Sequence, residues 1–137
     1  LYEDKEKSEQ AYRLAARGEF NLSSAMYYND QPPQMMYYSA KAIEALGDKD
    51  EAKKRFNAFI EYANNHMNDE MKIDYFAVSL PDFLIFEGDL NKNNKVHCNL
   101  MAALGYLGIG DNDNAQKYAK QGLELNQCHA ELRDIVK

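Results

Sequence analysis

The stretch AALGYLGIGDNDNA, residues 102–115, decides the expected fold, because the earlier stretch SAKAIEALGDKDEA, residues 39–52, repeats its pattern. Gly47 and Gly110 lie 63 residues apart, as do Ala52 and Ala115, so the two copies are in register. Each copy predicts a helix, a Gly-Asp turn and a second helix whose small residues face the first. Two such copies indicate stacked helical repeats, since one unit cannot bury its apolar face alone.

The second copy resembles a tetratricopeptide repeat and runs on to Asn126. The family has a small residue and an aromatic in its first helix, a Gly-Asp turn, an alanine in its second helix and a closing Leu-x-Leu. These features match Ala103, Tyr106, Gly110, Asp111, Ala115, Leu123 and Leu125, while Gln127 and Asn99 replace a common proline and a common tryptophan. The first copy matches at Ala40, Ala42, Gly47, Asp48, Ala52 and Phe56.

The resemblance implies a single all-α domain of antiparallel helix pairs, arranged as an α-solenoid with a right-handed superhelix. Its expected parts are a repeat remnant at 4–18, a repeat at 33–64, a helical insert at 65–95, a second repeat at 96–127 and a terminal or capping helix at 128–137. Apolar periodicity and turn residues predict the helices themselves. They are expected at 6–17, at 33–46, from Asp48 to a break at 64–69, at 91–107 and at 128–136.

The run IDYFAVSLPDFLIF, residues 73–86, is the most apolar part of the chain. Pro81 interrupts it, and proline cannot continue a helix, so we expect two short helices, with a pair of strands as the alternative. Carboxylates in pairs carry out glycoside hydrolysis, and the insert holds Asp74, Asp82, Glu87 and Asp89. The alternative interpretation is that Asp82 caps a helix while Glu87 and Asp89 lie in a polar turn.

The insert also has a resemblance of its own. The segment 74–84, followed by Asp89 and the His-Cys pair at 97–98, resembles the carboxy-terminal repeat region of large bacterial proteins. Those proteins combine an amino-terminal β-sandwich domain of uncharacterised function with a long tetratricopeptide array. The resemblance implies a bacterial source and a carbohydrate-related context.

Charge and composition restrict the partners. The net charge is −6 and no Lys/Arg cluster interleaves with aromatic residues, which argues against a nucleic-acid partner. No apolar run approaches the roughly 20 residues that span a bilayer, so no membrane partner is expected. Cys98 and Cys128 show no framework spacing, which favours a reduced, cytoplasmic setting.

Neither a cofactor nor a metal is expected. The cysteines and histidines at 97–98 and 128–129 are adjacent pairs, and neighbouring residues of a helix point about 100° apart. Zinc ligands are usually spaced by two to four residues instead. The glycines of GYLGIG, residues 105–110, follow no predicted strand, so we attribute them to close helix packing rather than to phosphate binding.

Binding therefore remains as the expected function. In tetratricopeptide repeats the first helix of each pair lines a groove, which here implies Gln34, Tyr37, Lys41, Glu44, His97, Leu100 and Leu104 as partner-binding residues. Burial of several of them by the insert or by neighbouring helices is the alternative. We expect a protein–protein or interdomain interaction module without catalytic activity of its own, whose tyrosine- and leucine-lined groove suits an amphipathic helix or a loop. The other hypotheses are an accessory part of a carbohydrate-active enzyme and a self-association module that forms a homodimer.

Overall fold

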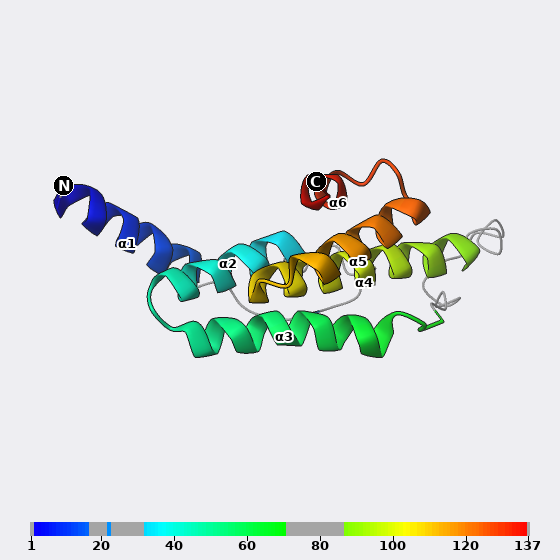
Figure 1. The fold of residues 1–137 in the computed structure, drawn as a ribbon, viewed down its shortest axis with the longest axis horizontal. Helices are drawn as coiled ribbons and strands as arrows, with labels where there is room; N and C mark the ends of the chain where they lie inside the picture. Colours follow the sequence, from blue (N-terminus) through cyan, green and yellow to red (C-terminus); the bar gives the residue numbers. More distant parts are fainter. Residues whose placement is uncertain (1, 17–21, 23–31, 71–86, 137) are drawn as a thin grey trace, which may run out of the picture.

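The computed structural model describes residues 2–16, 22, 32–70 and 87–136, and within these ranges every regular element is a helix (Figure 1). This confirms the all-α class for the described part of the chain. The helices are α1 (Tyr2–Ala16), α2 (Pro33–Ala45), α3 (Lys49–His66), α4 (Glu87–Ile109), α5 (Asn112–Leu125) and α6 (Ala130–Ile135).

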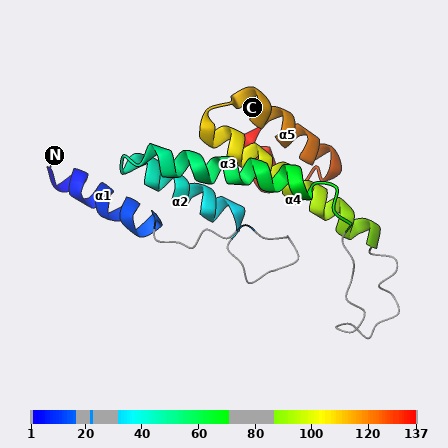
Figure 2. The ribbon, with the colours of Figure 1, turned by 90° about the horizontal axis from the view of Figure 1, so that it is seen from below.

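Each helix packs against the next one in the chain, and α2 also contacts α4, as α4 contacts α6. The two helices of each pair are therefore neighbours, and so are the first helices of successive pairs. Figures 1 and 2 show α1 projecting from one end of this arrangement, with α3 lying alongside α4. Residues 5–15 of α1 are all exposed.

The two Gly-Asp turns have the same backbone geometry. Gly47 and Gly110 have φ angles of 101° and 86°, values that glycine adopts without the steric cost of a Cβ atom. In each turn the amide of the following aspartate donates to the carbonyl five residues earlier, at 3.2 Å after α2 and 2.9 Å after α4. This is the hydrogen bond of a Schellman motif, which ends a helix by satisfying one of its free carbonyls.

The aspartate of each turn then begins the next helix. Asp48 Oδ1 accepts a hydrogen bond from the Glu51 amide at 3.1 Å, and Asp111 Oδ1 accepts one from the Asn114 amide at 3.2 Å. Both side chains satisfy an amide that has no partner within the helix. At both turns a glycine therefore ends one helix and the aspartate after it starts the next, as the sequence predicts.

The glycines of α4 allow α3 to approach closely. A Cβ atom placed on Gly105 would lie 2.7 Å from the Phe56 carbonyl oxygen, and one placed on Gly108 would overlap the Phe56 ring. The hypothesis of close helix packing is therefore confirmed for Gly105 and Gly108, whereas Gly110 serves the turn after α4. Around this contact lies the hydrophobic core, whose most completely buried large side chains are Phe56, Phe59, Met36, Met101, Leu132 and Cys98.

Several boundaries differ from the sequence-based expectation. Helix α3 continues to His66 through part of the expected break, and α4 begins at Glu87 rather than at Asn91. Residues 87–95, assigned to the insert, thus belong to the long first helix of the second pair. Glu87 and Asp89 lie in the first turn of α4, so the polar turn proposed for them is wrong. The two short helices or strands expected at 73–86 fall outside the described residues.

Removal of the Asp48 cap and removal of the Asp111 cap should destabilise the protein to a similar extent. We expect Asp48→Ala and Asp111→Ala each to lower the free energy of unfolding by about 1 kcal/mol, because an amide at the start of α3 or α5 loses its acceptor. Urea unfolding followed by circular dichroism measures this. The control is Glu61→Ala on the exposed face of α3, expected to change stability by less than about 0.5 kcal/mol. Equal effects of all three variants would contradict the assignment of the caps.

The close contact at Gly105 also predicts whether a substitution there stabilises or destabilises the protein. Alanine normally favours a helix over glycine by about 1 kcal/mol. We nevertheless expect Gly105→Ala to destabilise the protein by about 1–3 kcal/mol, because the added Cβ atom meets a backbone oxygen of α3 that cannot move aside. A stabilised Gly105→Ala variant in the same urea experiment would show that the two helices are not held at this distance.

Candidate functional site

Three of the seven predicted partner-binding residues lie in the core. Tyr37, Leu100 and Leu104 are 9%, 3% and 4% exposed. The Tyr37 ring packs against the Phe56 ring with 5.8 Å between centroids. These side chains were predicted to line a groove. In the structure they are buried by neighbouring helices instead, which is the alternative that the sequence analysis left open.

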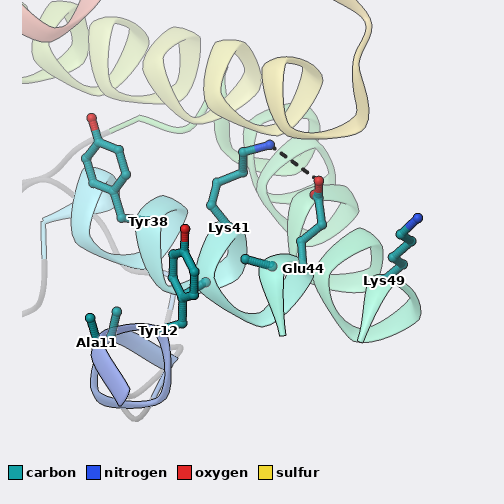
Figure 3. A pocket seen from close by; sticks show the side chains of 9 residues that line it. Ala11, Tyr12, Tyr38, Lys41, Glu44 and Lys49 are labelled. Atoms are coloured by element: carbon teal, nitrogen blue, oxygen red, sulfur yellow. Dashed lines mark ion pairs between the residues drawn. The ribbon is translucent and has the colours of Figure 1, made fainter. Parts of the chain in front are cut away.

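A groove does exist, at the end of the structure that carries α1 (Figure 3). It lies between α1, α2 and the start of α3 and has a volume of about 600 Å³. We call it the α1–α2 groove. Its lining consists of Ala11, Tyr12, Ala15, Tyr38, Lys41, Ala42, Glu44, Ala45 and Lys49.

The apolar part of the groove is made of alanines and two tyrosines. Tyr38 on α2 is 63% exposed and Tyr12 on α1 is 43% exposed. Tyr38 also contacts Tyr37 edge-on, with 5.4 Å between ring centroids, which connects it to the core. A tyrosine offers a large apolar ring with a polar tip, a combination enriched at protein interfaces. The groove thus provides exposed aromatic surface next to small side chains.

The charged part of the groove contains two of the predicted residues. Lys41 Nζ lies 3.6 Å from Glu44 Oε1, in an ion pair that is partly exposed (Figure 3). Lys41 Nζ also lies 5.9 Å from the centroid of the Phe56 ring. Exposed ion pairs of this kind contribute little to stability. They form a polar edge to the groove, and Lys49 adds a further positive charge at the start of α3.

The other two predicted residues do not line this groove. Gln34 lies in the first turn of α2 and is partly exposed, and His97 is half-buried on α4. The Tyr62 ring stands edge-on to the His97 ring with 6.0 Å between centroids. A partner-binding role of these two residues remains a prediction, separate from the groove.

An aromatic cluster surrounds Tyr62 at the end of α3. Tyr62 lies 4.4 Å from His66 between ring centroids, and His66 Nδ1 lies 2.6 Å from Asp69 Oδ2. Burial, with smaller contributions from Cys98 and Asp69, raises the pKa of Tyr62 to about 12. The Asn94 side-chain amide donates to the His66 carbonyl at 2.7 Å and joins α4 to the end of α3. These contacts hold the two helices together at this end.

The two cysteines are free thiols in different surroundings. Cys98 is buried in α4, and burial, with a smaller contribution from Asp69, raises the pKa of its thiol to about 12. Cys128 is exposed between α5 and α6. His129 is the N-cap of α6, since its Nδ1 accepts a hydrogen bond from the Leu132 amide at 3.4 Å. Within the described ranges, no three residues of metal-ligating type come together.

Of the carboxylates of the insert, Asp74 and Asp82 fall outside the described residues, and Glu87 and Asp89 lie in the first turn of α4. Sequence reasoning missed Tyr12, Tyr38 and Lys49 as groove residues. The sequence carries no signal for the exposure of Tyr38, because the equivalent Met101, 63 residues later, is buried through contacts between distant residues.

No protein-family model matches this chain, and no solved structure gives a significant match. None of the described helices combines the length and the apolar character needed to cross a membrane.

The two thiols should differ in reactivity. In the folded protein at pH 8 we expect a thiol reagent such as 5,5′-dithiobis(2-nitrobenzoate) to modify Cys128 alone, because the Cys98 thiol is buried and protonated and the thiolate is the reactive form. Cys98 should react only when the protein unfolds. The colour change counts the modified thiols, and Cys128→Ser is the control, in which native protein should show no rapid reaction. Two rapidly reacting thiols in native protein would contradict the burial of Cys98.

Proposed function

We propose that this chain is a tetratricopeptide-like helical repeat protein that acts as an interaction module, and that its α1–α2 groove binds a segment of a protein partner. The observation that carries the proposal is the exposure of Tyr38 and Tyr12 in one groove beside an apolar alanine surface. The partner is another protein or peptide, or another domain of the same parent chain.

The packing of the helices supports the repeat assignment. Helices α2 and α3 form one antiparallel pair and α4 and α5 another, each joined by a Gly-Asp turn of the same geometry. The contacts of α2 with α4 and of α4 with α6 fit stacked units in which each first helix touches the next. Such arrays build extended binding surfaces rather than enclosed reaction sites.

The chemistry of the groove favours binding over catalysis. Among the described residues that line it, Glu44 is the one carboxylate and lies beside Lys41 at 3.6 Å, and the others are alanine, tyrosine and lysine. A general acid or base needs a titrating group within reach of a substrate and a second group with a different role, and this lining provides no such pair. An accessory role in a carbohydrate-active enzyme and self-association remain the alternatives, and we include neither nucleic acid nor a cofactor among the expected ligands.

A displayed peptide library tests the proposal. The protein is used to select peptides, and the selected peptides are then measured against Tyr38→Asp and against Ile109→Asp, an exposed apolar residue outside the groove. We expect selected peptides to lose at least about tenfold in affinity with Tyr38→Asp, because a charge replaces a central aromatic contact. Affinity for Ile109→Asp should change less than twofold.

Two results would overturn the proposal. The first is a selection that yields no peptide above background. The second is a set of peptides that bind the wild-type protein and Tyr38→Asp equally, which would place their site elsewhere. Circular dichroism and thermal unfolding of both variants establish that each is folded, which is expected because both side chains are exposed.

A further inference from the structure

Helix α4 carries a stripe of four residues, of which Cys98, Met101 and Gly105 are buried and Gly108 is partly buried. Cys98, Met101, Gly105 and Gly108 follow one another at spacings of three, four and three, which places them on one face of the helix. Cys98 and Met101 are 0% exposed, and the two glycines lie against Phe56 of α3. We call these four residues the α4 stripe.

Helix α2 carries the matching stripe 63 residues earlier, which we call the α2 stripe: Met35, Tyr38, Ala42 and Ala45. Its second half faces α1, since Ala42 and Ala45 line the α1–α2 groove together with alanines of α1. Its first half is open, because Met35 is 57% exposed and Tyr38 is 63% exposed. Two equivalent faces therefore differ in how much of each is covered.

The described residues that lie against each stripe differ along its length. Helix α3 runs along α4 as far as His66, whose carbonyl accepts from the Asn94 side-chain amide (Figure 2). Ala11, Tyr12 and Ala15 of α1 line the groove beside Ala42 and Ala45 of α2. Among the described residues, none covers Met35 or Tyr38 to the extent that Cys98 and Met101 are covered.

The covered stripe shows which kind of surface fits the open one. Along α4, the covering helix presents Phe56, Phe59 and Ala63, all at most 1% exposed, with Ile60 beside Gly105. These residues follow the spacing of three and four that forms one apolar face of a helix. The open stripe has the same spacing and offers Met35 and Tyr38, a pliable side chain and a rigid aromatic one.

We infer that the open half of the α2 stripe, Met35 and Tyr38, binds an amphipathic helix of a partner protein, with large apolar residues at spacings of three and four. The bound helix takes the place on α2 that the second half of α3 takes on α4. This inference rests on the proposed function and specifies its ligand, because the same groove could instead bind an extended segment.

The probe is a fluorescent peptide with the sequence of α3, residues 49–66. Most of the stability of a protein helix comes from its packing against the rest of the protein, so a lactam bridge joins Asp50 to Lys54, two exposed residues four positions apart, to keep the isolated peptide helical. Fluorescence anisotropy measures its binding to the full chain. We expect saturable binding that Met35→Asp and Tyr38→Asp each weaken at least about tenfold, whereas Ile109→Asp changes it less than twofold.

A second peptide tests the role of the apolar face. It carries Phe59→Asp and keeps the lactam bridge, and we expect it to lose binding to the same extent because its charge would be buried against α2. Circular dichroism of both peptides shows whether they are equally helical. Retained binding of the Phe59→Asp peptide would overturn the inference.

Other outcomes are decisive as well. Absence of saturable binding of the α3 peptide, or its equal binding to the wild-type protein and Tyr38→Asp, overturns the inference.

The peptide library separates the inference from the proposed function. If the library yields peptides that depend on Tyr38 but are rich in proline or not helical when bound, the inference fails and the proposed function stands. Multi-angle light scattering provides the remaining test: a concentration-dependent dimer that Tyr38→Asp abolishes would assign the stripe to a second copy of this chain and overturn a separate partner.

Discussion

The contact of Phe56 with α4 is the interaction on which the rest of this structure depends. Gly105 and Gly108 have no side chain, so α3 comes close enough for the Phe56 ring to lie directly on the α4 backbone. The same ring lies 5.8 Å from the Tyr37 ring of α2. One buried aromatic side chain therefore joins three helices from two successive pairs, and dense interiors of this kind tolerate little change in volume.

The local parts of the fold could be predicted from the sequence, because local geometry determines them. A glycine with positive φ and an aspartate that caps the next helix act within a few residues, so Gly47 and Gly110 were sufficient to place both turns. The start of α4 could not be placed in this way. Gly88 indicated a turn, yet it lies in the first turn of a long helix, where glycine costs only about 1 kcal/mol and the packing of later residues compensates.

The candidate site could be predicted only in part, because burial depends on contacts between distant residues. The family resemblance placed Lys41 and Glu44 in a groove lined by the first helices of both repeats, whereas in the structure they line the α1–α2 groove, to which α4 contributes no residue. It also placed Leu100 and Leu104 on a surface, although their spacing of four residues directs both into the core that α3 and the neighbouring helices complete. Tyr38 was missed because a single tyrosine does not show which way its helix faces.

The size of the side chains where two helices cross explains why a groove occurs at one place and a solid core at the other. Helix α3 places a phenylalanine against glycines of α4, so a large and a small surface fit closely. Helix α1 places Ala11 and Ala15 near Ala42 of α2, and small surfaces that face each other leave a volume of about 600 Å³. The same backbone pattern thus gives a closed contact or an open groove according to whether one residue of the covering helix is large. The groove at α1 is therefore encoded in the alanines of α1 as much as in the exposed tyrosines that surround it.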